Sequence, residues 1–163
     1  MSQHAPLHHG YGRLITDGTF MLCSLYFSDG IARVYDPSRP DPWPLALSGD
    51  DLAVITVEGQ NIWCGVELAL WSAEVDVPEG AWEASATVDV AYRAEAEVNT
   101  IGQLYQFDGT IGDFKVPAGS YRLRAVARGR EAVRHIATEI GQPTDPSELV
   151  EQIRIDLWPI EAS

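Results

Sequence analysis

The sequence predicts an all-β protein, an antiparallel β-sandwich of about 8–10 short strands with little helix. Three observations support this prediction. Some segments alternate with a strict period of two, one turn motif occurs twice, and no segment sustains the apolar stripe of a packed helix. Frequent Gly, Pro, Asp and Asn residues between the apolar runs fit short strands joined by turns.

Residues 82–92 show the clearest alternation in the chain. Their apolar face consists of Trp82, Ala84, Ala86, Val88, Val90 and Tyr92. This pattern is typical of an antiparallel strand with one buried and one solvated face, so we expect Trp82 in the core. Residues 121–128 and 153–157 repeat the alternation.

The motif Val-Pro-x-Gly-x-aromatic occurs at residues 77–82 and again, 39 positions later, at residues 116–121. Each copy opens one of the alternating strands. Proline fixes one turn position, and glycine permits a positive φ at a later one. A duplicated binding unit would explain the repeat, but we favour a shared turn chemistry at two corresponding corners of a sandwich.

Further strands follow from the apolar runs and the turn residues between them. We expect two short strands within residues 11–27, joined by a tight hairpin turn at Asp17-Gly18. Strands are also predicted at residues 52–57 and 62–71. The core side of the latter is formed by Cys64, Val66, Leu68 and Leu70.

The helical signals are short and weak. Residues 91–98, 131–140 and 146–149 are predicted to form at most a turn or two each. Four prolines between residues 37 and 44 exclude regular structure in that connection.

We expect a single β-sandwich domain over residues 11–163, preceded by a flexible lead-in of residues 1–10. The lead-in lacks the cationic start and apolar centre of a secretory signal peptide. No apolar stretch approaches the ~20 residues that a membrane helix needs. We therefore expect a cytoplasmic protein that does not enter membranes.

The formal net charge of −13 is the most unusual bulk property. A negative field repels nucleic acid and anionic membranes and attracts basic partners, although acidity can also serve solubility alone. The charge is uneven along the chain. Residues 49–97 carry eleven acids and one base, whereas residues 115–134 carry six bases and one acid.

The search for catalytic or metal-binding motifs finds none. A phosphate-binding glycine loop and a nucleophile elbow are both missing. Cys23 and Cys64 lie far apart within apolar runs, where cysteine acts as a small hydrophobe. Three of the four histidines fall in the lead-in, and His135 has no spaced partner. The sequence therefore predicts a non-enzymatic protein without a cofactor or metal.

The candidate partner-binding surface is acidic and includes the predicted solvated strand faces. It consists of Glu67, Glu74, Asp76, Glu79, Glu83, Asp89, Glu95 and Glu97. We expect it to bind a basic protein, such as a nuclease or toxin, by electrostatic steering. Alternatively, these acids pair with the later arginines across neighbouring strands, and then the surface largely disappears.

Two other functions stay open. A carbohydrate- or calcium-binding β module would use exposed indoles or loop carboxylates. The tryptophans on the parity opposite to their strands' apolar neighbours are Trp63, Trp71 and Trp158. Candidate calcium ligands are Asp50, Asp51, Asp76, Glu79, Glu95 and Glu97. A small enzyme with an unrecognised carboxylate pair is the other alternative, because spacing in sequence does not give separation in space.

Residues 114–123, which contain the second proline-glycine-tyrosine corner, and the ending at residues 153–159 carry a family resemblance. They resemble a class of small uncharacterised bacterial proteins and are similar to the competence nuclease inhibitor family, which has a comparable corner. The resemblance implies a cytoplasmic inhibitor or immunity protein that covers a nuclease or toxin. It transfers no inhibitory residue, because the matching positions are structural.

Overall fold

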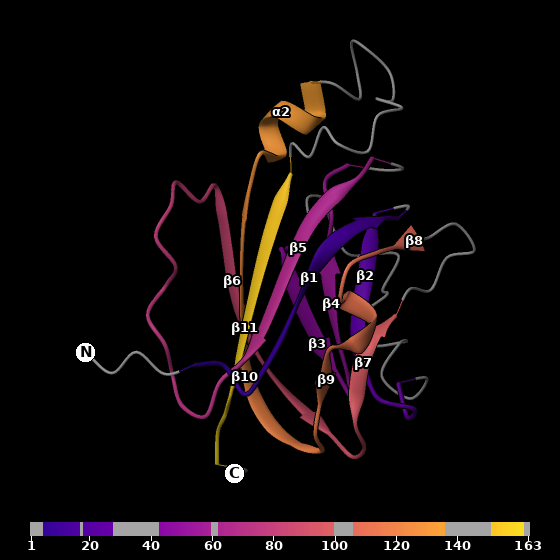
Figure 1. The fold of residues 1–163 in the computed structure, drawn as a ribbon, viewed down its shortest axis with the longest axis vertical. Coiled ribbons are helices and arrows are strands. Elements are labelled where there is room, and N and C mark those ends of the chain that lie inside the picture. Colours follow the sequence, from indigo (N-terminus) through magenta and orange to yellow (C-terminus); the bar gives the residue numbers. More distant parts are fainter. Residues whose placement is uncertain are drawn as a thin grey trace.

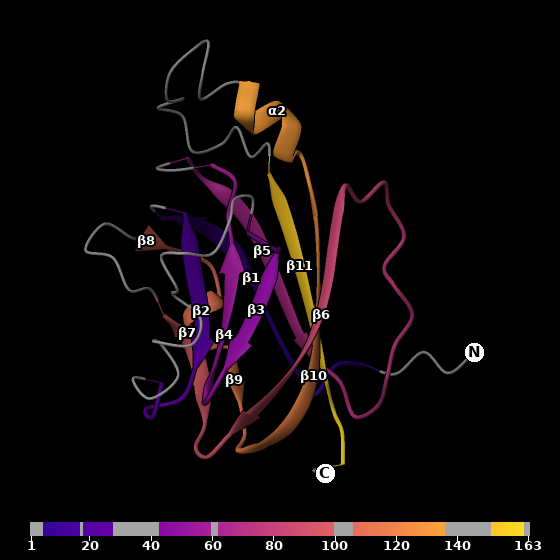
Figure 2. The ribbon, with the colours of Figure 1, turned by 180° about the vertical axis from the view of Figure 1, so that it is seen from behind.

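The computed structural model describes residues 5–16, 18–27, 43–59, 62–99, 106–135 and 151–161. Within these residues, eleven strands form two sheets that pack against each other (Figures 1 and 2). The predicted all-β fold with little helix is confirmed. The described helices are the 3₁₀ turn η1 (Ile111–Asp113) and α2 (Arg130–His135), and neither is long and apolar enough to span a membrane.

Sheet A has the strand order β6-β10-β11-β5-β1-β8. Its strands are β1 (His8–Ile15), β5 (Cys64–Leu70), β6 (Ala84–Tyr92), β8 (Gln106–Phe107), β10 (Gly119–Arg128) and β11 (Gln152–Pro159). Sheet B has the order β3-β4-β2-β7-β9. Its strands are β2 (Thr19–Cys23), β3 (Ala46–Gly49), β4 (Leu52–Thr56), β7 (Ala96–Asn99) and β9 (Lys115–Val116). Among the described pairs only β5 and β11 run parallel, so sheet A is mixed rather than purely antiparallel.

The core lies between the two sheets, and the predicted parity of several strands is confirmed. Cys64, Val66, Leu68 and Leu70 of β5 are buried in it. Tyr121 and Leu123 of β10 and Ile155 of β11 join them. Both cysteines are free and buried, and burial raises the pKa of the Cys23 thiol to about 11. These thiols therefore act as packing groups rather than nucleophiles.

The predicted hairpin at Asp17-Gly18 is wrong. The flanking strands β1 and β2 lie in different sheets, where β1 pairs with β5 and β8, and β2 pairs with β4 and β7. The two strands are therefore not hairpin partners; each has two neighbours in its own sheet, which stabilise it more than a single two-stranded hairpin would. Strand β1 also begins at His8, within the segment expected to be a flexible lead-in, because His8, His9 and Gly10 pair with residues of β5.

Of the three predicted helical turns, one is confirmed and one is wrong. Helix α2 overlaps the predicted residues 131–140 and starts one residue earlier, at Arg130. Residues 91–98 instead end β6 and form most of β7, where Ala96 and Val98 are buried. Residues 146–149 and most of the proline-rich connection lie outside the described residues.

Candidate functional site

Residues 71–83, which connect β5 to β6, form the most acidic connection that the structure describes, and we call them the acidic loop. They contain four acids and no base. The loop runs along sheet A beside β6 in both views (Figures 1 and 2). Connections of this length without secondary structure are uncommon in compact domains, and those that are ordered usually carry function.

Arg124, on the outer face of β10, fixes the middle of the acidic loop. Its Nη1 donates to the Val75 carbonyl and its Nη2 to the Asp76 carbonyl, each at 2.9 Å. Arg124 is only 8% exposed, and its guanidinium also lies over the Trp158 ring, 5.2 Å from its centroid. The middle of the loop is thus held through its main chain and not through its carboxylates.

Further hydrogen bonds fix the two ends of the acidic loop. At the start, the Trp71 indole N–H donates to Asp156 Oδ1 at 2.8 Å. At the end, the Glu83 carboxylate accepts main-chain N–H groups of Glu131 at 3.2 Å and Gly129 at 2.8 Å. These bonds lower the pKa of Glu83. Glu83 therefore acts as a cap where β10 meets α2 rather than as a free surface charge.

The two Val-Pro-x-Gly-x-aromatic copies adopt the same local structure. The Trp82 indole N–H donates to the Pro78 carbonyl at 2.8 Å, as the Tyr121 hydroxyl donates to the Pro117 carbonyl at 2.7 Å. The glycines between them have φ values of 145° and 150°, which a residue with a Cβ rarely adopts.

Their aromatic side chains, however, point to different places. Tyr121 is buried in the core, whereas Trp82 is only partly buried and lies on the outside of sheet A. The prediction that Trp82 belongs to the core is therefore wrong. The chain enters β6 only at Ala84, and the indole packs under Arg128 of β10 instead, with the guanidinium carbon 4.9 Å from the ring centroid.

Four of the eight predicted partner-binding acids are engaged within the protein. Glu83 is the cap described above, and Asp89 pairs with Arg122 across β6 and β10 at 2.8 Å. The hydrogen bond from Arg122 lowers the pKa of Asp89. Glu67 pairs with His9 and Arg154, and Glu97 pairs with Lys115 of β9 in sheet B. For Glu67, Asp89 and Glu97 the alternative of pairing with basic side chains of neighbouring strands holds, whereas Glu83 is bonded to main-chain N–H groups.

The other four predicted acids are exposed. Glu74 adds to the effect of Asp89 that raises the pKa of Arg122. The side chains of Glu74, Asp76, Glu79 and Glu95 form no hydrogen bond or ion pair with any residue that the structure describes. The first three share the acidic loop, and Glu95 lies apart between β6 and β7. Val77, in the middle of the loop, is also 55% exposed. Three carboxylates that bond to no described residue and one exposed apolar side chain thus lie within residues 74–79 of the acidic loop.

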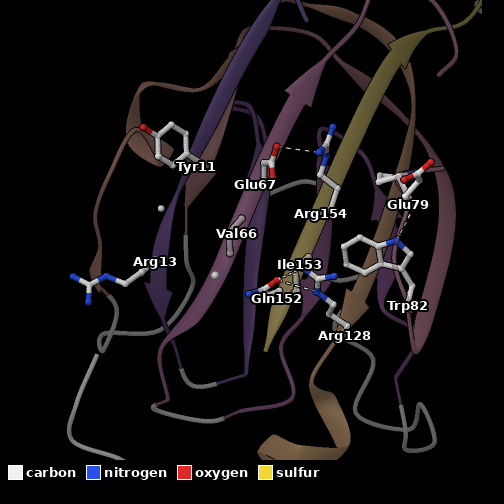
Figure 3. Close-up of a pocket in the computed structure, with 13 residues that line it drawn as sticks. Tyr11, Arg13, Val66, Glu67, Glu79, Trp82, Arg128, Gln152, Ile153 and Arg154 are labelled. Carbon is white, nitrogen blue, oxygen red and sulfur yellow. Dashed lines mark hydrogen bonds and ion pairs between the residues drawn. The ribbon is translucent and has the colours of Figure 1, made fainter. Parts of the chain in front are cut away.

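A trough of about 560 Å³ lies between the acidic loop and the outer face of sheet A. Figure 3 shows Glu79 and Trp82 on one side of it and Tyr11 and Arg13 on the other. Gly65 of β5, which has no side chain, also lines it. Glu67, Arg128, Gln152 and Arg154 also line the trough.

The sequence did not predict this trough or the roles of Arg124 and Arg128. Alternation along β10 puts both arginines on the face opposite to Tyr121 and Leu123, but Arg124 is buried there whereas Arg128 is exposed. Local alternation does not show which strand lies beside β10. Asp156 and Gln152 of β11 contact Arg124 and Arg128 because β10 and β11 pair in sheet A.

Three of the indoles are covered on one face by an arginine. Arg13 lies over Trp63 with its guanidinium carbon 4.9 Å from the ring centroid, and Arg128 and Arg124 cover Trp82 and Trp158 as described above. Trp158 is itself only 5% exposed. These contacts reduce the open aromatic surface that a sugar-stacking platform needs.

The candidate calcium ligand Asp51 is engaged inside the protein. Its carboxylate accepts bonds from Ser24 Oγ at 2.9 Å and from the main chain and Nε of Arg93, both at 2.6 Å. Burial alone would raise the pKa of Asp51, but the bonds from Arg93 and Ser24 outweigh it, and the pKa is lowered. In the described part of the chain, no three His, Cys, Asp or Glu side chains are grouped as a metal site.

No family model and no curated protein sequence matches the chain. Its fold, however, resembles two solved structures. ComJ from Bacillus subtilis, an inhibitor of the DNA-degrading activity of NucA, aligns with a TM-score of 0.54 and 11% identity over 98% of this chain and 100% of ComJ. The product of crocagin biosynthetic gene J aligns with a TM-score of 0.52 and 15% identity over 95% of this chain and 100% of that one. The similarity to the nuclease inhibitor family is thus confirmed at the level of the fold.

Proposed function

We propose that this chain is a non-enzymatic inhibitor that binds a basic protein, a nuclease or a nuclease-like toxin, through its acidic loop. The fold it shares with ComJ, whose target is a DNA-degrading protein, supports the inhibitor class. The net charge of −13 suits a basic target and disfavours nucleic acid and anionic membranes as partners.

The observation that carries this proposal is that the main chain of the acidic loop is held in place while three of its carboxylates are not bonded to any described residue. Arg124 and the corner at Pro78 hold its main chain, whereas Glu74, Asp76 and Glu79 are left exposed. A surface that is already ordered loses little conformational entropy on binding. Its free carboxylates attract cations without first breaking internal ion pairs, so this loop is suited to fast, salt-sensitive capture of a basic protein.

The proposed contact surface is narrower than the sequence predicted. Glu74, Asp76 and Glu79 form its centre, and Val77 supplies an apolar contact among them. Glu67 lies at the adjoining trough, where it pairs with Arg154. The other predicted partner-binding acids contribute at the rim of this surface or through the overall electrostatic field of the protein. They are Glu83, Asp89, Glu95 and Glu97.

Affinity capture followed by a nuclease assay tests this function. The immobilised protein would be incubated with an extract of its native cells at low ionic strength and eluted with salt. We expect a basic protein that degrades DNA, and adding stoichiometric free protein should stop that degradation. Captured proteins without DNA-degrading activity, or with activity that the added protein leaves unchanged, would contradict the proposal.

The alternatives draw less support from the described residues. The trough contains two carboxylates, Glu67 and Glu79, but Glu67 is already paired with His9 and Arg154, whereas the acid pair of a glycosidase must face its substrate. The likeness to a crocagin biosynthesis protein shows only that this fold occurs in another setting.

A further inference from the structure

Arg128 differs from the other basic side chains that the structure describes. Nine arginine and lysine residues fall in the described ranges, and eight of them have an Asp or Glu oxygen within ion-pairing distance. Arg128 has none. Its bonded partner is the neutral Gln152, whose Oε1 accepts from Nε at 2.9 Å and from Nη2 at 2.5 Å.

The Arg128 guanidinium is also fixed in place. It lies over the Trp82 ring, and its two bonds to Gln152 set its orientation. Nη1 donates no hydrogen bond to any residue of the described ranges. It lies beside Gly80, where an added Cβ would come within 3.2 Å of it. The acidic loop therefore approaches this nitrogen closely without neutralising it.

The position of Arg128 is the second part of the argument. It lines the same trough as Glu79 and Trp82 (Figure 3), so one rigid, unneutralised cation adjoins the proposed acidic contact surface. A partner that covers this surface removes water from Arg128. The lost hydration must then be replaced by an acceptor, and a carboxylate is the best match for a guanidinium.

We propose that Arg128 determines specificity in this interface by receiving a carboxylate of the basic partner. The inference rests on the proposed function. A basic protein without an acid at this place brings like charge against Arg128, and the contact is disfavoured. A cognate partner presents one Asp, Glu or C-terminal carboxylate among its cations. A free small anion fits less well, because the carboxylates of the acidic loop repel it.

The test compares Arg128→Gln with Arg122→Gln. Both residues lie on the outer face of β10 and both changes remove one positive charge, but Arg122 is paired with Asp89 and does not line the trough. Binding to the captured basic partner would be measured by surface plasmon resonance. We expect Arg128→Gln to weaken the complex at least tenfold, mainly through faster dissociation, and Arg122→Gln to change it less than threefold.

Two additional measurements separate recognition from collapse of the acidic loop. Arg128→Met keeps an apolar cover over Trp82 without the charge, and it should weaken the complex as Arg128→Gln does. Poly-L-lysine, a polycation without acidic side chains, should bind both variants at least as tightly as it binds the wild type. Weaker poly-L-lysine binding by both variants would show that the loop had moved, and would overturn the inference.

The outcomes distinguish this inference from the function it rests on. If the wild type binds its partner and Arg128→Gln binds it equally well, only the role of Arg128 is wrong. Equal losses for Arg128→Gln and Arg122→Gln would also overturn that role, because both would then act through net charge. If the wild type captures no basic partner, the proposed function and this inference are both wrong.

Discussion

Arg124 and Asp156, on the neighbouring strands β10 and β11, form a buried ion pair on the outer face of sheet A, with Nη2 3.5 Å from Oδ2. Arg124 also holds two main-chain carbonyls of the acidic loop, and Asp156 holds the Trp71 indole at its start. The conformation of the loop therefore depends on a charged pair in the underlying sheet.

Replacing Arg124 should destabilise the fold and release the acidic loop. Arg124→Met leaves Asp156 buried with one fewer cation, although Arg154 still bonds to it. Removing one partner of a buried pair typically costs 3–5 kcal/mol, and we expect about 3 kcal/mol because of the remaining partner. Urea denaturation measures this change.

Arg122→Gln is the matched control for that experiment. Arg122 lies two positions earlier on the same face and forms an exposed ion pair, so its loss should change stability little. In the Arg124→Met variant, the main-chain amides of Trp71 and Glu83, which donate to the Leu157 and Ala127 carbonyls at the two ends of the acidic loop, should exchange with solvent faster than in the control. Equal stability and equal exchange in the two variants would contradict the positioning role of Arg124.

The second corner motif should contribute more stability than the first. Tyr121→Phe removes the hydroxyl that donates to the Pro117 carbonyl at a buried ring, and we expect a loss of about 1 kcal/mol in the free energy of unfolding. Trp82→Phe removes the equivalent bond to Pro78 at a partly exposed ring, so its cost should be smaller. Thermal and urea unfolding of both variants give the comparison, and the reverse order would contradict it.

Asp51 should make the protein sensitive to acid. Its folded-state pKa lies below the ordinary value of 3.8, so its contribution to stability is fully present above pH 3.8 and is lost as the pH falls through the folded-state pKa. Asp51→Asn should therefore be less stable than the wild type at neutral pH, and this difference should shrink at low pH. Urea denaturation at pH 7 and near pH 3 measures it.

Glu151 contributes a pH dependence of stability with the opposite sign to that of Asp51, so the two contributions must be separated. Burial raises its pKa above 4.5, so its contribution is greatest below pH 4.5 and falls as the pH rises through the folded-state value. Comparing Asp51→Asn with the wild type at each pH cancels the contribution of Glu151. A stability difference that stays constant with pH would show that Asp51 keeps its ordinary pKa.

Strand identity and the buried faces could be predicted from the sequence because period-two alternation is a local property. Every second residue from Cys64 to Leu70 and from Tyr121 to Ala127 faces the core as expected. Which strands pair could not be predicted. Asp17-Gly18 suits a hairpin turn locally, yet the strands on either side of it lie in separate sheets. Ala96 and Val98 belong to a strand although residues 91–98 have a weak helical pattern, because tertiary packing outweighs local propensity.

The candidate site could be predicted in the same partial way. Glu74, Asp76 and Glu79 were identified from charge alone. The ion pairs of Asp89 with Arg122 and of Glu67 with Arg154 could not be predicted, because they depend on the order of strands in sheet A. The same order creates the trough around Arg128, which no local pattern indicates.

The central claim, that the acidic loop captures a basic partner, is tested most directly by the association rate constant at low ionic strength. The loop variant carries Glu74→Gln, Asp76→Asn and Glu79→Gln. The control variant carries Asp113→Asn, Glu131→Gln and Glu161→Gln, which changes three other exposed acids and alters the net charge equally. We predict that association slows at least tenfold for the loop variant and at most threefold for the control, as expected of localised steering. Equal slowing in both variants would contradict the claim, because net charge alone would then govern binding.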